Sequence, residues 1–498
     1  MQATIWTLLP PTIAIILALA TKEVYVSLLI GILSGALLFV GGNPITAVDT
    51  TFSVMGTKMS GNADILIFLV LLGILVALIS KSGASLAYGN WATSKIKTKR
   101  GALLATTALG SLIFVDDYFN CLTVGTVMRP VTDKHKITRA KLAYIIDSTA
   151  APVCIIAPIS SWAAAVSTSL PENMQKDGFS IFMKTIPFNF YAIFTLVFMF
   201  FIILTGLDLF KMKKVESEGL DTSSQANGEE FEIVGKGHVL DLILPILFLI
   251  ISAVGFMLYT GKFFNGTGVS IKDAFADCTA GRSLVLASFF TLLFTFFLYI
   301  PRKIINFNQF CDSIVEGFKA MTPSITILCL AWTLSGICSE KYLNLQGFVA
   351  SHMNPDNIAG LAMFLPALFF VISLGLAFST GTSWGTFAIL IPIAASVFPG
   401  HDMLVISIAA ILAGAVCGDH ISPISDTTIL ASAGAQCHHI DHVSTQLPYA
   451  LSVAVCCIIG FLVAGVFQNG YYGLLAGSIA LAVMLVFYYI KANKPAEE

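Results

Sequence analysis

Long apolar runs separated by short polar stretches dominate the hydropathy pattern of this chain. Most runs have the length of about 20 residues that an α-helix needs to cross a bilayer. The pattern therefore predicts an all-α polytopic membrane protein. The expected spans, several of them interrupted, are 6–20, 24–40, 65–79, 102–128, 142–170, 190–204, 240–258, 284–300, 325–338, 359–397 and 403–433, followed by two more before the C-terminus.

Polar residues interrupt the run 102–128 at Asp116-Asp117-Tyr118. Basic clusters flank this run on both sides, at 95–100 and 129–141. Because short loops rich in Lys and Arg stay in the cytoplasm, both clusters are expected on that side. The run must then enter and leave the membrane by one face, as a re-entrant hairpin or a closely paired span, with Asp116 and Asp117 near its tip.

A similar order of elements occurs twice along the chain. Pro158-Ile159-Ser160-Ser161 in the first half matches Pro423-Ile424-Ser425-Asp426 in the second, and each follows a helix of small residues. By the charge count one half opens inward and the other outward, which predicts an inverted-topology repeat with two hairpins and two broken helices. The predicted division is N-terminal scaffold helices (1–62), a first repeat (63–207, hairpin 101–130, broken helix 140–170), a cytoplasmic linker (208–238), connecting scaffold helices (239–303), a second repeat (304–467, hairpin 358–397, broken helix 403–434) and a C-terminal helix and tail (468–498).

Composition agrees with a membrane protein and narrows the alternatives. Hydrophobic residues make up 56% of the 498 residues and charged residues only 11%, whereas about a quarter of a soluble protein is charged. The net charge of −2 and the lack of a basic stripe give no reason to expect a nucleic-acid partner. The apolar N-terminus has no basic start and no cleavage site, so we interpret it as a first span. Most of the ten cysteines lie in apolar runs, where a thiol is usually a small buried hydrophobe.

The stretch 418–432 carries the strongest candidate site, because it places carboxylates and hydroxyls between two very apolar runs. An ionised group at bilayer depth is costly unless it is paired, hydrated or bound to an ion. Pro423 breaks the helical ladder and leaves carbonyls nearby without partners. Oxygen ligands suit a hard cation, and a carboxylate can carry a proton instead. A turn in water beside the membrane is the alternative. The candidate cation ligands here are Asp419, Ser425, Asp426 and Thr427.

Other polar interruptions supply further candidates. Hydroxyls and amides near helix breaks could attract an anionic group at a half-helix N-terminus, although small residues there also serve helix packing. Asp147 is either a site carboxylate or a charge partner of Arg129 or Lys141. His420 could tune proton affinity, and a satisfied core histidine is the simpler reading. The Cys437-His438-His439 group is spaced too closely for a usual metal site. The remaining candidate ligands for a cation or substrate are Asp116, Asp117, Asn120, Ser160, Thr382 and Ser383.

These residues resemble the NhaC family of Na⁺/H⁺ antiporters, within the wider ion transporter superfamily. The resemblance is carried by Gly381-Thr382-Ser383-Trp384-Gly385-Thr386, by 420–432 and, in the first half, by Val115-Asp116-Asp117-Tyr118 and Asp147-Ser148-Thr149-Ala150-Ala151-Pro152. It implies a secondary transporter of the inner membrane, working by alternating access as a homodimer. No cofactor is expected beyond Na⁺ and H⁺ as transported ions. The family also includes carriers of organic acids and amino acids, so the solute stays open.

Two other function classes fit the sequence less well. An intramembrane aspartyl protease also needs two membrane carboxylates, but its Gly-x-Gly-Asp signature lacks the first glycine before Asp419. An enzyme is therefore not expected. A channel is the third class, and paired broken helices favour alternating access over a continuous pore. Lys491 and Lys494 place the C-terminus in the cytoplasm.

Overall fold

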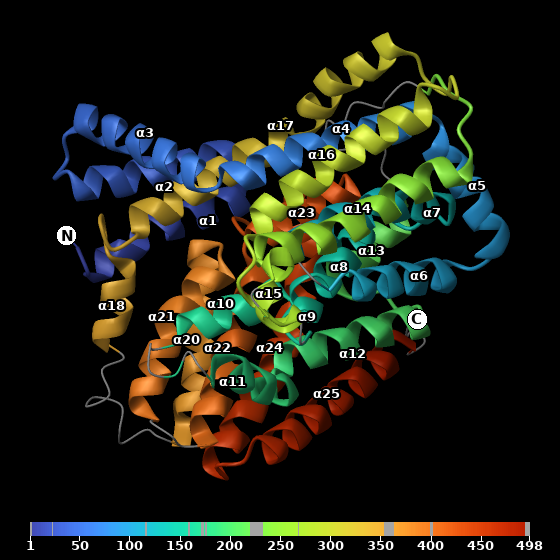
Figure 1. Cartoon of the computed structure of the whole chain (residues 1–498). Coiled ribbons are helices and arrows are strands. Elements are labelled where there is room, and N and C mark those ends of the chain that lie inside the picture. Colours follow the sequence, from blue (N-terminus) through green and yellow to red (C-terminus); the bar gives the residue numbers. More distant parts are fainter. Residues whose placement is uncertain are drawn as a thin grey trace.

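The computed structural model describes residues 2–21, 23–114, 117–157, 160–170, 174, 177–219, 233–266, 268–352, 363–398 and 402–493. Throughout these ranges the regular structure is helical (Figure 1). Seven helices are long and apolar enough to cross a membrane, or up to eight if the bent pair Tyr25–Phe39 and Pro44–Gly61 forms one span. The predicted all-α polytopic membrane protein is confirmed.

The long helices of one group, among them α3, α4, α16 and α17, cross the upper part of Figure 1. The helix α17 lies against α2, α3 and α4, and α16 lies between α4 and α14. Apolar side chains such as Ile251 of α14 and Phe297 of α16 point outward, as expected for surfaces in contact with lipid. The members of this group are α1 (Leu9–Thr21), α2 (Val24–Phe39), α3 (Pro44–Gly61), α4 (Ala63–Lys81), α5 (Ala84–Lys95), α14 (Val239–Thr260), α15 (Ile271–Ala276), α16 (Ala280–Tyr299), α17 (Phe307–Cys338) and α18 (Leu345–His352).

The second group contains the candidate residues and is organised around α22, whose span is 94% buried inside the protein. The helices α20, α21, α24 and α12 all contact α22. The members are α6 (Lys99–Leu112), α7 (Asp117–Lys134), α8 (Arg139–Thr149), α9 (Ala151–Cys154), α10 (Ser161–Ser169), α11 (Gly178–Thr185), α12 (Phe190–Thr205), α13 (Phe210–Glu218), α20 (Leu365–Thr380), α21 (Ser383–Val397), α22 (Asp402–Ile421), α23 (Asp426–Ala435), α24 (His439–Val466) and α25 (Gly470–Asn493).

Hydroxyl side chains start the helices on which the candidate residues lie. Thr98 accepts a hydrogen bond from Gly101 N at the start of α6, and Thr138 accepts one from Lys141 N at the start of α8. Thr382 and Ser425 cap α21 and α23 in the same way. Each cap satisfies a backbone N–H that has no partner within its own helix. The polar breaks in the sequence are therefore the places where new helices begin.

The two halves contact each other reciprocally. The hairpin α6–α7 precedes the broken helix α8–α10, and the hairpin α20–α21 precedes the broken helix α22–α23. The last helix of each broken pair packs against the second helix of the other hairpin, α10 on α21 and α23 on α7. Trp162 of α10 contacts Trp384 of α21 edge-on, with ring centroids 6.2 Å apart. Two structurally related halves are expected to make reciprocal contacts of this kind. The inverted repeat itself and the domain bounds stay predictions.

The two basic clusters 95–100 and 129–141 meet at one end of the molecule, together with α13. His135 Nε2, after α7, lies 3.0 Å from the carbonyl oxygen of Ile96, before α6. Glu216 of α13 pairs with Lys99 and accepts a hydrogen bond from Thr138 N at 2.9 Å. The hairpin α6–α7 therefore begins and ends on one face, as its flanking charges predicted.

Two stretches outside the expected spans are ordered. The stretch 41–62 contains the helix α3, which Asn43 caps ahead of Pro44. The linker 208–238 is not an unstructured tether over its described residues, because α13 is helical. Residues 233–238 also dock, since the N–H groups of Val234 and Gly235 both donate to Lys81 O at 3.0 Å.

Candidate functional site

The break between α22 and α23 lies directly against the break between α20 and α21. Gly381 adopts a left-handed conformation (φ +68°), and a Cβ atom there would lie 2.3 Å from the carbonyl oxygen of Ile424. A side chain at this position would therefore push the two breaks apart. Carbonyls near the α22–α23 break have partners. Thr428 Oγ1 donates to Asp419 O at 3.1 Å, and His439 Nε2 lies 2.7 Å from Pro423 O.

Asp419, in the last turn of α22, is the centre of the candidate site and is almost completely buried. Its Oδ2 accepts hydrogen bonds from Ser383 Oγ at 2.9 Å and from Thr427 Oγ1 at 3.4 Å. Its Oδ1 accepts no hydrogen bond from any described residue. One oxygen of this carboxylate is therefore held by hydroxyls, and the other is the part of the cluster that most needs a further partner.

Asp426 opens α23 and lies next to Asp419 in the same cluster. Its Oδ2 accepts a hydrogen bond from Tyr118 OH of α7, and its Oδ1 accepts one from Thr427 N at 2.9 Å. Thr427 thus joins both carboxylates, with its backbone on Asp426 and its hydroxyl on Asp419. Ser425 Oγ completes the set 3.1 Å from Thr427 Oγ1. We call Ser383, Asp419, Ser425, Asp426 and Thr427 the carboxylate cluster.

Two of the helix ends at the carboxylate cluster are N-termini, which favour negative charge, whereas Asp419 itself lies at the C-terminal end of α22. The helices α21 and α23 begin at Ser383 and Asp426, so both place a positive N-terminal end next to a carboxylate. No Lys or Arg makes an ion pair with Asp419 or Asp426 among the described residues. Two carboxylates, three hydroxyls and two helix N-termini therefore make a site that can hold either a small cation or a proton.

Asp147 lies on α8 beside this cluster and has partners that the sequence did not predict. Gln446 Nε2 of α24 donates to Asp147 Oδ2 at 2.5 Å, and His442 Nε2 lies 3.7 Å from the same oxygen. Lys141 instead pairs with Asp208 at 2.5 Å. Arg129 makes no ion pair with Asp147 in the described part of the chain; it lies on α7 one turn before Asp133. The expected partnership of Asp147 with Arg129 or Lys141 is therefore wrong.

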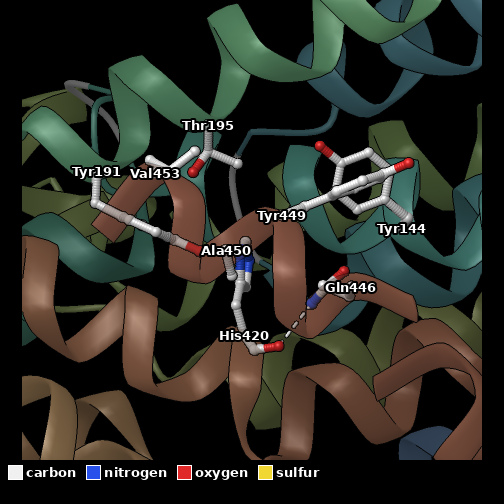
Figure 2. A pocket seen from close by; sticks show the side chains of 8 residues that line it. All are labelled: Tyr144, Tyr191, Thr195, His420, Gln446, Tyr449, Ala450 and Val453. Carbon is white, nitrogen blue, oxygen red and sulfur yellow. Dashed lines mark hydrogen bonds between the residues drawn. The ribbon is translucent and has the colours of Figure 1, made fainter. Parts of the chain in front are cut away.

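His420 turns away from Asp419, toward α8 and α12. Its Nε2 lies 3.1 Å from Asp147 O, and Tyr191 OH lies 3.2 Å from its Nδ1. Figure 2 shows Gln446 reaching the backbone carbonyl of His420, a bond of 2.8 Å, beside a small cavity that Tyr449 also lines. Both ring nitrogens have partners, as expected of a satisfied core histidine.

Several other candidates serve the backbone rather than the carboxylate cluster. Asn120 Nδ2 lies within 3.2 Å of the carbonyls of Gly110, Ile113 and Thr149, so it fastens α7 to α6 and α8. Ser160 Oγ donates to Cys154 O at 2.8 Å, and Thr382 caps α21. Asp117 is buried in the first turn of α7. Asp116, like Pro158 and Ile159, lies outside the described residues.

Sequence reasoning missed the residues that reach the candidate site from distant helices. Tyr118 follows the two candidate aspartates, and its hydroxyl donates to Asp426. His442 and Gln446 lie four residues apart on the apolar helix α24, a spacing that puts both on one face. Two polar residues on one face of an apolar helix were the feature of the sequence that could have indicated this contact. Among the described residues no group of three or more His, Cys, Asp or Glu has the geometry of a metal site.

Comparison with known proteins agrees with this arrangement. A family model described as the Na⁺/H⁺ antiporter family matches residues 162–466. A Haemophilus influenzae protein of uncharacterised function is 40% identical over 97% of this chain and 95% of its own length. A Bacillus subtilis malate-2H⁺/Na⁺-lactate antiporter is 28% identical over 46% of each chain. An uncharacterised Na⁺/H⁺ antiporter of Haemophilus influenzae is 31% identical over 30% of this chain and 32% of its own. This chain is a cation-coupled secondary transporter and belongs to the Na⁺/H⁺ antiporter family.

Proposed function

We propose that this protein exchanges Na⁺ for H⁺ and that both ions use the carboxylate cluster in turn. The observation that carries the proposal is the shared position of Asp419 and Asp426 at a break between two helices, joined by Thr427. Carboxylate and hydroxyl oxygens are the ligands that a hard cation prefers.

The negative charge of the carboxylate cluster explains why binding of Na⁺ would be coupled to release of H⁺. Two ionised carboxylates deep in the protein repel each other and are poorly solvated, so an empty and fully ionised cluster is unfavourable. Binding of either Na⁺ or a proton to these carboxylates reduces their mutual repulsion. Na⁺ and H⁺ compete because each neutralises the same carboxylates. The cluster can change from one side of the membrane to the other only when one of these ions is bound.

Competition has a measurable signature in the pH dependence of Na⁺ binding. Over the range where the site is protonated in the absence of Na⁺, the dissociation constant for Na⁺ is expected to rise about tenfold for each unit that pH falls. The two carboxylates titrate together, so the curve reports the pair rather than either residue. Calorimetry on the purified protein at several pH values gives the constant directly. A Na⁺ affinity that stays constant from acidic to alkaline pH rejects the shared site.

A coupled organic anion is the second candidate, supported by the Bacillus subtilis relative, which by its description exchanges malate with protons for lactate with Na⁺. The N-termini of α21 and α23 also face the carboxylate cluster and could receive a carboxylate of a solute next to a bound cation. Proteoliposomes with a Na⁺ gradient separate the two proposals. Uptake of labelled malate or lactate only in the presence of the gradient favours the anion carrier, whereas proton movement without any organic acid favours simple exchange.

We further propose that the protein works as a homodimer in the cytoplasmic membrane, with its basic end and its C-terminus in the cytoplasm. Its activity is transport without a chemical step, and it needs no cofactor beyond the transported ions. The Lys and Arg excess of the loops around α6 and α7 supports the orientation. Cross-linking in membranes tests the dimer.

A further inference from the structure

A second buried polar cluster lies around Ser432 of α23, separate from the carboxylate cluster. Ser432 Oγ lies 3.1 Å from Nδ1 of His439 and 2.9 Å from Nδ1 of His442. It also lies 2.7 Å from the carbonyl oxygen of Thr428. All three side chains are buried, with at most 8% of any one exposed.

The outer nitrogens of both histidines face groups that can only accept hydrogen bonds. His439 Nε2 lies 2.7 Å from the carbonyl oxygen of Pro423, so it must carry a hydrogen. His442 Nε2 lies 3.0 Å from Gln446 Oε1. The orientation of that amide is fixed, because its nitrogen donates to Asp147 Oδ2 and to His420 O. Both imidazoles therefore carry hydrogen on Nε2, and when neutral each has only a lone pair on Nδ1.

Ser432 cannot satisfy two such lone pairs. Its hydroxyl has one hydrogen, so with two neutral imidazoles at least one Nδ1 faces the oxygen at about 3 Å with no hydrogen between them. In the structure the Ser432 hydroxyl donates to the carbonyl oxygen of Thr428. One added proton removes the conflict between the rings, because a protonated imidazole donates to Ser432 Oγ while the hydroxyl turns from that carbonyl to the other ring. We propose that His439, Ser432 and His442 form a proton-binding site that holds one proton, with Asp147 as its counter-ion.

Charge balance supports this assignment. Asp147 Oδ2 lies 3.7 Å from His442 Nε2, and Lys141 of the same helix is already paired with Asp208. A buried carboxylate without a cationic partner is strongly unfavourable, and a protonated His442 supplies one. The other titratable or charged groups that face this part of α24 are Tyr144 of α8, Tyr191 of α12, His420 of α22 and, near its start, His438 and Lys211 of α13 with Asp441.

The position of the site connects it to transport. His439 holds the Pro423 carbonyl, which lies in the break that shapes the carboxylate cluster. Gln446 joins His442 to the backbone of His420, the residue after Asp419. Loss of the proton leaves an Nδ1 lone pair facing Ser432 Oγ without a hydrogen, on the two rings whose Nε2 atoms make these contacts. This link to ion exchange rests on the proposed function, whereas the bound proton itself can be measured without any transport.

Nitrogen-15 NMR of the full-length protein with labelled histidine tests the site. The chain has eight histidines. At pH 7.5, about one unit above the ordinary imidazole pKa of about 6.5, an exposed histidine is only about a tenth protonated. We expect one imidazolium with both nitrogens protonated. Either His439→Leu or His442→Leu should remove it, because the remaining neutral ring accepts the Ser432 hydrogen. The matched control His438→Leu, at an exposed neighbour, should leave it unchanged.

Two carboxylate variants complete the test. Asp147→Asn removes the counter-ion and should lower the imidazolium signal at pH 7.5 at least about twofold. Asp419→Asn should keep the signal while Na⁺ binding is lost, so a failure of the cation site is distinguishable from a failure of this one. The proposal is overturned if the wild-type protein shows only neutral histidines at pH 7.5. Persistence of the imidazolium in both leucine variants also overturns it, and the wild-type spectrum decides even if a variant does not fold.

Discussion

At the scale of single residues, the carboxylate cluster depends on Thr427 more than on any other uncharged side chain. Among the residues that the structure describes, it is the one whose backbone binds one carboxylate and whose hydroxyl binds the other. Its neighbours Ser383 and Tyr118 reach the cluster from α21 and α7. The ligand set is therefore complete only when three separate parts of the chain are packed together.

Asp419→Asn should abolish Na⁺ binding and leave the fold intact. The amide can still accept a hydrogen bond from Ser383 but no longer carries the charge that holds the ion. At a Na⁺ concentration 100 times the dissociation constant, binding stabilises the wild-type protein by about 2.7 kcal/mol, and this increment should disappear. The measurement is the melting temperature with and without Na⁺.

The control for that variant is Asp441→Asn, at a half-exposed aspartate near Lys211 on the protein surface. It should keep the full Na⁺-dependent shift. A normal shift in Asp419→Asn would show that the ion binds elsewhere.

At the scale of elements, the helices α7 and α23 cross so closely that only glycine fits at the points of contact. A Cβ atom on Gly434 would lie 2.3 Å from the carbonyl oxygen of Cys121, and one on Gly125 would lie 2.3 Å from the carbonyl carbon of Gly434. Small residues at helix crossings are the usual means of close packing in membranes. Here the close approach brings Tyr118 within reach of Asp426.

Gly434→Ala should therefore separate α7 from α23. The added methyl group meets backbone atoms, which cannot move aside as a side chain can, and we expect destabilisation of about 1–3 kcal/mol or more. Gly255→Ala is the matched control, since nothing lies within 4 Å of its Cβ position on α14. Melting curves of both variants give the comparison; equal melting temperatures would mean that the close crossing is not needed.

At the scale of the whole molecule, the basic loops around α6 and α7 lie at one end, together with α13 and the end of α25. Arg100 donates to Thr205 O at 3.2 Å, at the end of α12, and Phe210 contacts Tyr488 of α25 with ring centroids 5.4 Å apart. The last turns of α25 lie at this same end of the molecule (Figure 1). A protein with its Lys and Arg gathered in this way is expected to insert with that end in the cytoplasm.

Single-cysteine labelling checks this orientation. In a chain whose native cysteines are replaced, Lys97→Cys and Lys134→Cys should both react with an impermeant thiol reagent only from the cytoplasmic side. A cysteine at Gly266, in the loop between α14 and α15, should react only from the opposite side. Labelling of positions 97 and 134 from different sides would contradict both the paired hairpin and the inverted repeat.

The sequence by itself determined the class of protein, most of the spans and the places where helices break. These features follow from local properties: apolar length against bilayer thickness, and Gly, Pro and hydroxyl residues that end one helix and cap the next. Asp419, Asp426, Ser425 and Thr427 share one short stretch, so their proximity was also predictable. Ser383 was predicted from the second break, which the structure places against the first.

Only the tertiary structure decided which distant side chains meet. Tyr118 and Asp426 are 308 residues apart, and Gln446 and Asp147 are 299 apart. Their pairing depends on how each helix is rotated and how closely it crosses its neighbour, and periodicity along one chain contains neither quantity. The sequence also could not show which groups the candidate ligands Asn120, Ser160 and Thr382 would contact. In the folded protein Asn120 Nδ2, Ser160 Oγ and the Thr382 side chain bind backbone groups instead, because a buried helix end must satisfy its own N–H and C=O groups first.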